Sequence, residues 1–249
     1  MQSSGAFVPT LIGVTALVAL TSAVLLGYRV RSPWSAAFAV LRGMIQLAAV
    51  AFVLSGVITN PVWVGLALAV MFGVAVATAS NRIGGSKRQL AVIGSGMGAG
   101  VLASLTLVFV TGALELSPRY ALAIGGIVIG NSMSIATLAG RRCSQTIAHD
   151  WDEVEAWLAL GATPRQATAT IARSAVRESL IPTVDQTKTT GMVTLPGAFV
   201  GAIFGGASPL EAGRFQIVVL AAIMAAGSIA AVLIVHQLSP VRHKPLLLQ

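Results

Sequence analysis

The chain has 249 residues, of which 55% are hydrophobic and 10% are charged, and its mean hydropathy is +0.85. Soluble domains carry about 25% charged residues, so this composition excludes an ordinary soluble enzyme, a nucleic-acid-binding domain and a disordered linker. Apolar runs of about 20 residues recur along the chain, and a helix of that length can cross a bilayer. We therefore expect an all-α polytopic membrane protein, with residues 1–249 forming a single transmembrane domain.

The net charge of +8 does not indicate a nucleic-acid partner, because the basic residues lie in short segments between apolar runs. A single cysteine, Cys143, excludes an intramolecular disulfide, and no C-x-x-C motif is present. The first apolar run lacks a basic segment before it and an A-x-A site after it. We expect it to be a retained helix rather than a signal peptide.

Hydropathy predicts about seven membrane-spanning helices. In chain order they cover approximately Phe7–Tyr28, Trp34–Ile58, Pro61–Ser80, Leu90–Thr111, Arg119–Ala139, Thr189–Ala207 and Phe215–His236. The sixth is short and rich in glycine, so a re-entrant segment is the alternative for it. That alternative would move the basic C-terminal tail outside and contradict the distribution of charge, so seven spans is the better count.

Thirteen of the sixteen Lys and Arg residues follow the first, third, fifth or seventh predicted span. They are Arg29, Arg31, Arg82, Lys87, Arg88, Arg141, Arg142, Arg165, Arg173, Arg177, Lys188, Arg242 and Lys244. Basic residues are enriched in cytoplasmic loops. We therefore expect the N-terminus outside and the C-terminus in the cytoplasm.

Residues 140–188 form the one long segment of soluble composition. A first short helix is expected to end at Gly161, and a second is expected over Pro164–Leu180, stopping before Pro182. In one interpretation both helices lie on the lipid headgroups. In the other, exposed Trp157 of the first helix inserts into a groove on a partner protein.

The first of these helices carries a recognisable motif. Glu155-Ala156-Trp157, with Gly161 four residues after the tryptophan, keeps the spacing of the "EAA…G" loop of ABC-transporter permeases. Leu160-Gly161-Ala162-Thr163-Pro164 looks like the "LGAS" continuation of that loop. The chain departs from the motif at Trp157, where alanine is usual, and it lacks the leucine-proline that is expected shortly after the glycine.

Further segments resemble the FetB-type permease family in order and spacing along nearly the whole chain. They are Arg42–Leu47, Gly130–Ser134, Leu195–Gly197, Gly205–Ala212 and Arg214–Ile217. Bacterial members of this family are linked to iron export and plant relatives to aluminium tolerance. The resemblance implies the permease subunit of an ABC transporter that exports a metal, iron, across a bacterial inner (plasma) membrane.

The resemblance also implies how the subunit works. A homodimer of permeases would pair with a separate ATP-binding subunit through a cytoplasmic coupling helix. The coupling residues would be Glu155, Ala156, Trp157, Leu160, Gly161 and Ala162. The sequence has no G-x-x-x-x-G-K-[ST] phosphate loop. We therefore expect no enzymatic activity and no cofactor in this chain, with ATP and magnesium on the partner subunit.

Polar residues inside the predicted spans are candidates for a translocation path, because such residues usually face a partner or a water-filled cavity. The candidates are Arg42, Gln46, Asn131, Ser132, Met133, Ser134 and Pro196. The structural alternatives are snorkelling of Arg42 to the headgroups and hydrogen bonding between helices for the others. No metal site is evident, since the three histidines are far apart in sequence, and iron enters only through the resemblance.

Two other classes of function compete with an ABC permease. One is an ATP-independent secondary transporter, against which stand the lack of a convincing inverted repeat and of an acidic residue inside a predicted span. The other is a membrane scaffold that recruits a partner without transporting anything. Association with an ATPase distinguishes an ABC permease from a secondary transporter. A transport assay distinguishes either transporter from a scaffold.

Overall fold

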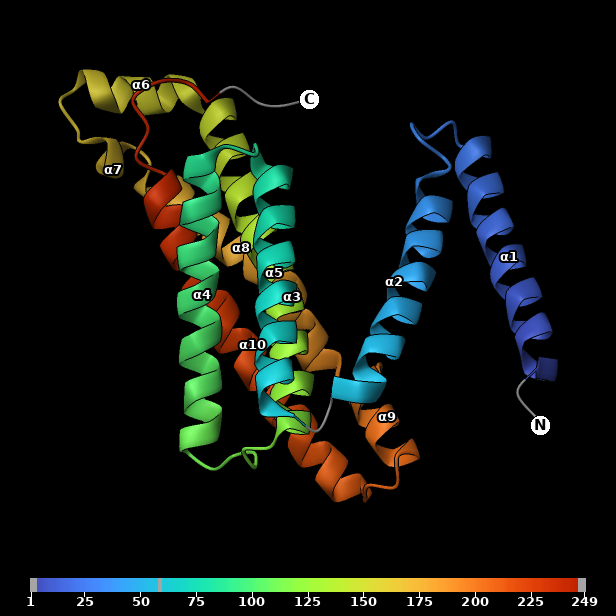
Figure 1. Cartoon of the computed structure of the whole chain (residues 1–249). Coiled ribbons are helices and arrows are strands. Elements are labelled where there is room, and N and C mark those ends of the chain that lie inside the picture. The colour runs from blue at the N-terminus through green and yellow to red at the C-terminus, as the bar shows by residue number, and fades with distance from the viewer. Residues whose placement is uncertain (1–3, 58–59, 246–249) are drawn as a thin grey trace. The chain divides into compact units, whose positions relative to one another are not determined.

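A computed structural model describes residues 4–57 and 60–245 of the chain, and the regular elements there are helices (Figure 1). In chain order they are α1 (Ser4–Gly27), α2 (Ser35–Val57), α3 (Pro61–Ile83), α4 (Lys87–Val110), α5 (Pro118–His149), α6 (Trp151–Ala159), α7 (Pro164–Ala167), α8 (Ala169–Thr189), α9 (Gly197–Phe204) and α10 (Pro209–Leu238). The predicted end of the second span, Ile58, lies outside the described residues.

The chain forms two compact units, Met1–Ile58 and Thr59–Gln249. The first contains α1 and α2, which pack against each other as a hairpin. The second contains α3 to α10, and its core lies where α3, α4, α5 and α10 meet. The single transmembrane domain expected from the sequence stays a prediction.

Within the described residues, five helices are long and apolar enough to cross a membrane. They are Val8–Gly27, Pro61–Ile83, Lys87–Val110, Pro118–His149 and Pro209–Leu238. These helices coincide with the first, third, fourth, fifth and seventh predicted spans, and the described part of α2 adds the shorter apolar stretch Ser35–Ala48. An all-helical, multi-pass architecture is therefore confirmed at this level.

The long helices of the second unit begin at residues that cap them. Asn60, Ser86, Ser117 and Ser208 each accept a hydrogen bond from a backbone N–H in the first turn of the helix that follows. At α10 the cap is reciprocal: the Glu211 N–H donates to Ser208 Oγ at 3.3 Å, and the Ser208 N–H donates to a Glu211 carboxylate oxygen at 3.0 Å. Such caps satisfy N–H groups that have no partner inside the helix, and so they define where each helix starts.

Two glycines of α4 allow its backbone to lie in direct contact with α10. A Cβ atom placed on Gly100 would collide with the carbonyl oxygen of Ala226, and one on Gly96 would lie 2.6 Å from Cγ1 of Ile234. This close approach is the contact that small residues four apart permit between membrane helices. Within the glycine run 94–100, Gly96 and Gly100 therefore serve the packing of α4 against α10.

This contact makes the replacement Gly100→Ala destabilising, because the new methyl group meets backbone that cannot rotate away. We expect a loss of about 1–3 kcal/mol, the range for overpacked cores. The matched control is Gly98→Ala, whose methyl would lie at an ordinary 3.6 Å from the Phe72 ring. Thermal unfolding in detergent should show a lower midpoint for Gly100→Ala alone; equal midpoints for both variants would contradict the close contact.

The sixth predicted span, Thr189–Ala207, is wrong as a single helix. It contains the last residue of α8, an irregular turn over residues 190–196 and the short helix α9. Gly191 has φ +87°, and its N–H donates to the Thr194 carbonyl at 2.8 Å. Hydropathy was misleading because it averages over apolar residues without detecting the backbone turn that Gly191 and Pro196 produce.

The expected stop of the second cytoplasmic helix before Pro182 is also wrong. The segment begins with the predicted proline, Pro164, but divides into α7 and α8, and α8 continues through Pro182 to Thr189. Pro182 is exposed on α8. Proline inside a helix is tolerated in membrane proteins when its surroundings satisfy the freed carbonyl.

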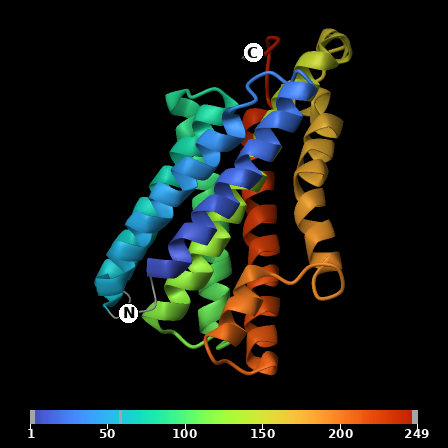
Figure 2. The ribbon, with the colours of Figure 1, turned by 90° about the vertical axis from the view of Figure 1, so that its right-hand side faces the viewer.

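Because α8 is longer than expected, the position of Lys188 also differs from the one expected in the cytoplasmic segment. Figure 2 shows α8, in gold, running back along the bundle from the end that carries α6. Lys188 lies in its last turn, where its Nζ is 3.6 Å from the Asp185 carboxylate. The pair therefore lies well away from the α6 end.

Candidate functional site

The short helix α6 lies across one end of the bundle of the second unit (Figure 1). It is anchored by one face: Val154 is fully buried, Trp151 packs against the core, and Leu158 is half-buried. This spacing of three and four residues leaves the opposite face, with Glu155 and Ala156, exposed. The structure thus presents the first two residues of the predicted coupling motif at the surface.

The end of α6 is fixed by its glycine. Gly161 has φ +92°, its N–H donates to the Leu158 carbonyl at 3.0 Å, and the Ala162 N–H donates to the Trp157 carbonyl at 3.0 Å. This pair of bonds is the Schellman motif, which closes a helix with a glycine in the left-handed region. The predicted end of the helix at Gly161 is confirmed, and it holds Leu160 in a position where 81% of its surface is exposed.

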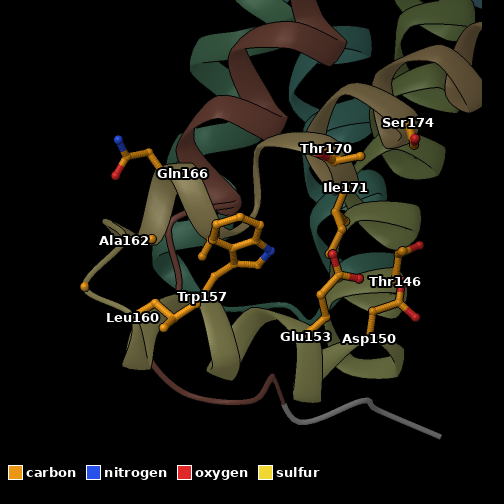
Figure 3. Close-up of a pocket in the computed structure, with 12 residues that line it drawn as sticks. Thr146, Asp150, Glu153, Trp157, Leu160, Ala162, Gln166, Thr170, Ile171 and Ser174 are labelled. Atoms are coloured by element: carbon orange, nitrogen blue, oxygen red, sulfur yellow. The ribbon is translucent and has the colours of Figure 1, made fainter.

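A pocket of about 630 Å³ lies between α6, the end of α5 and the start of α8. Figure 3 shows the Trp157 indole directed into this space, with the Glu153 carboxylate beside Ile171. Trp157 remains 52% exposed, and Leu160 lies at the rim. The exposed aromatic and aliphatic side chains around this concave surface have the chemistry of a protein-binding site.

The same end of the unit is basic. The turn between α3 and α4 carries Arg82 and Lys87, and the Arg141 Nε donates to the Arg82 carbonyl at 2.9 Å, which ties this turn to α5. Arg142 forms an ion pair with Glu178 of α8 at 3.4 Å. Basic residues near helix ends mark the cytoplasmic side of membrane proteins.

The backbone at Gly161 yields a direct test of this turn. The replacement Gly161→Ala meets no atom within 4 Å but must keep φ at +92°, so we expect a loss of about 1 kcal/mol in the local stability of the turn. Gly213→Ala is the control, because it also meets open space and lies inside a helix. Hydrogen exchange of the Ala162 amide should become faster only in Gly161→Ala; unchanged protection would contradict the cap.

The polar candidates on α5 bond mainly to their own helix. The Asn131 side-chain NH₂ donates to the Ile127 carbonyl at 2.8 Å, and the Ser134 hydroxyl is 3.4 Å from the Gly130 carbonyl. Ser132 is fully buried and its Oγ has no hydrogen-bond partner among the described residues, while Met133 packs against the core. Asn131 and Ser134 thus remain accessible from a partly open face, whereas Ser132 faces the interior.

The remaining path candidates do not lie on α5. Arg42 and Gln46 lie one turn apart on α2 of the first unit, and both are exposed. Pro196 precedes α9 in the second unit as its N-cap residue. Among the described residues, no group of three or more His, Cys, Asp or Glu side chains is arranged to hold a metal ion.

The structure adds a feature that the hydropathy reasoning missed. Asp185 and Lys188 form their ion pair on a helix that packs against α5 and α10, both of which are candidate membrane spans. The segment 183–188, with two threonines and two charges, carries this signal. Its soluble composition instead placed it in the predicted cytoplasmic segment 140–188.

These elements define a multi-pass helical membrane protein with a polar helical segment across one end of its main bundle. The chain belongs to the family described as Uncharacterised protein family (UPF0014), whose model matches residues 8–240. This membership agrees with the resemblance seen in the sequence.

Relatives in plants and bacteria are similar over much of the chain. The rice "UPF0014 membrane protein STAR2" is 34% identical over 89% of this chain and 79% of its own length. The Arabidopsis thaliana "Protein ALUMINUM SENSITIVE 3" is 36% identical, covering 87% and 81%. The Escherichia coli (strain K12) "Probable iron export permease protein FetB" is 35% identical over 55% of this chain and 52% of its own length. No solved structure is significantly similar to this chain.

Proposed function

We propose that this chain is the permease subunit of an ABC transporter, driven by a separate ATP-binding subunit. The observation that carries the proposal is α6, a short surface helix that presents Glu155 and Leu160 next to an open pocket. The name of the Escherichia coli relative contains the words iron export permease. Iron is therefore the substrate that we propose, with export as the direction.

The connections of α6 suit the transmission of movement. Asp150 is both the last cap of α5 and the first cap of α6, so the two helices join without a loop. On its other side, α6 leads through the Schellman turn and α7 into α8. A displacement of α6 by a bound partner would therefore reach two helices of the bundle directly, as in a rigid lever between packed elements.

The proposal includes an orientation and an assembly. The basic α6 end of the second unit faces the cytoplasm, where ATP is available, and the C-terminus lies on the same side. The N-terminus is outside, in a bacterial plasma membrane. Two copies of the permease bind two ATP-binding subunits, so that each α6 contacts one of them.

A charge reversal on α6 tests the coupling role. In Glu155→Lys the exposed carboxylate becomes an ammonium group, and we expect at least about a tenfold loss of transport per ATP hydrolysed, because a displaced interface misaligns the lever. Gly161→Pro should act likewise by destroying the helix end. Transport and ATPase activity are measured together in vesicles that contain the tagged chain and its ATP-binding subunit.

The control for this test is Glu115→Lys, which changes the same charge in the loop before α5, at the other end of the unit. It should leave the ratio of transport to hydrolysis unchanged. Coupled transport of normal efficiency in Glu155→Lys and Gly161→Pro would remove the docking role. Purification of the chain without any ATP-binding subunit would favour a secondary transporter instead.

A second variant tests the path along α5. Asn131→Leu removes an amide whose own bond is internal to the helix, so the fold should survive. We expect transport to fall about tenfold while assembly with the ATP-binding subunit is retained, because a polar lining group has been lost. Ala123→Leu, exposed on the same helix, is the control. Normal transport by Asn131→Leu would return this residue to a packing role.

A further inference from the structure

The part of α5 that lies inside the membrane can be identified from its charged residues. The 21 residues from Tyr120 to Gly140 carry no charge, and they are flanked by Arg119 and Arg141. At about 1.5 Å per residue they span about 31 Å, which matches the hydrocarbon layer of a bilayer. Residues 120–140 therefore mark the membrane interior of the second unit.

The ion pair between Arg142 and Glu178 gives the position of α8 relative to this layer. The two helices run in opposite directions, since α8 returns along the bundle from the α6 end (Figures 1 and 2). Asp185 lies seven residues past Glu178, about 10 Å deeper, and Lys188 lies about 15 Å deeper. Both are thus well inside the layer, and Lys188 is near its centre.

The side chains of this pair are not covered by the second unit. Those of Asp185 and Lys188 are 62% and 71% exposed, and Gln186 between them is exposed as well. Charged groups at the centre of a bilayer face a water-filled cavity or other protein rather than lipid. Because Arg142 lies about 3 Å outside the layer, Lys188 is about 12 Å from the surface, which is too deep for its side chain to reach the headgroups.

The backbone after α8 supports the same conclusion. The chain leaves the helix at Thr189, turns through residues 190–196, and enters α9 at Gly197, whose preceding residue Pro196 offers no side-chain cap. The first N–H groups of a helix need partners from outside it. Inside a membrane, irregular backbone is tolerated where it lines water or is buried in protein.

The partly open face of α5 lies at the same depth. Asn131 precedes Arg142 by 11 residues, or three helical turns, so both side chains leave α5 on one side. Arg142 contacts α8. The face with Asn131 therefore continues from that contact to the level of Lys188.

We propose that the second half of α8, residues 180–189, lines a water-filled path through the membrane, with Asp185 and Lys188 as its charged constriction. The solute class that fits is a small hydrated ion, because the side chains of both charges are exposed on α8. The assignment of this path to transport rests on the proposed function; its contact with water does not.

Water contact can be measured by reaction with thiols. The chain has one cysteine, Cys143, which is fully buried, so an introduced cysteine is read against a low background. Gln186→Cys is treated with membrane-impermeant methanethiosulfonate reagents in membranes. We expect it to react at least about tenfold faster than Leu102→Cys, because thiolates form in water and not in hydrocarbon.

Two controls bracket the result. Leu102→Cys replaces an exposed apolar residue in the middle of α4, and Ser174→Cys lies on the exposed side of α8 near the α6 end. Reaction at 174 and 186 but not at 102 supports the path. Reaction at 174 alone means that lipid, a second copy or another protein covers residues 180–189, and it overturns the proposal.

The charges supply a second readout that also needs no transport. In the Gln186→Cys background, Lys188→Gln should raise the rate for a cationic reagent relative to an anionic one at least about twofold, and Asp185→Asn should lower it. Equal ratios in both variants would remove the charged constriction. If the labelling succeeds but no ATP-binding subunit is found, the path stands and the ABC assignment fails.

Discussion

The architecture of the second unit depends on the backbone contact between α4 and α10. Gly100 lets the backbone of α4 lie directly against the Ala226 carbonyl, and Gly96 leaves room for the Ile234 side chain beside the Ala230 carbonyl. In lipid there is little hydrophobic force between helices, so such close packing is a main source of association. The other side of α10 receives Ile135 of α5 at Gly227, and α8 packs against both α5 and α10. The position of α8 thus depends on how closely α4, α10 and α5 pack at these three glycines.

The two polar regions of this unit are linked through α5. Its C-terminal end continues into α6 through Asp150, and its middle carries Asn131 at the proposed depth of the ion pair on α8. A partner that moves α6 would act on the same helix that borders the proposed path. Since α8 also returns from α6, both walls of that path are connected to one surface element. Energetic coupling between distant sites requires such contiguous rigid elements.

The sequence predicted the long apolar helices because lipid requires uninterrupted apolar runs, and it placed the end of α6 because Gly161 has few structural alternatives. It wrongly predicted a single helix over Thr189–Ala207 for the same reason. Averaging hydropathy favoured the apolar turn after Thr189 over the charged helix before it, although tertiary packing holds α8 against α5 and α10. Asp185 and Lys188 could have been noticed as a pair spaced for one helix face. Their depth depends on the contact between Arg142 and Glu178, which no local pattern encodes.

Pro182 gives α8 a mechanical property beyond its role in the path. It lies four residues after Glu178, whose carbonyl therefore has no N–H donor within the helix. Helices bend most readily where such a bond is missing. Before Pro182 in the chain, Glu178 connects α8 to α5 through its ion pair with Arg142. After Pro182, the helix ends in an exposed turn. Pro182 is therefore the point at which α8 bends most readily, and it lies between the half that pairs with Arg142 and the half that carries Asp185 and Lys188.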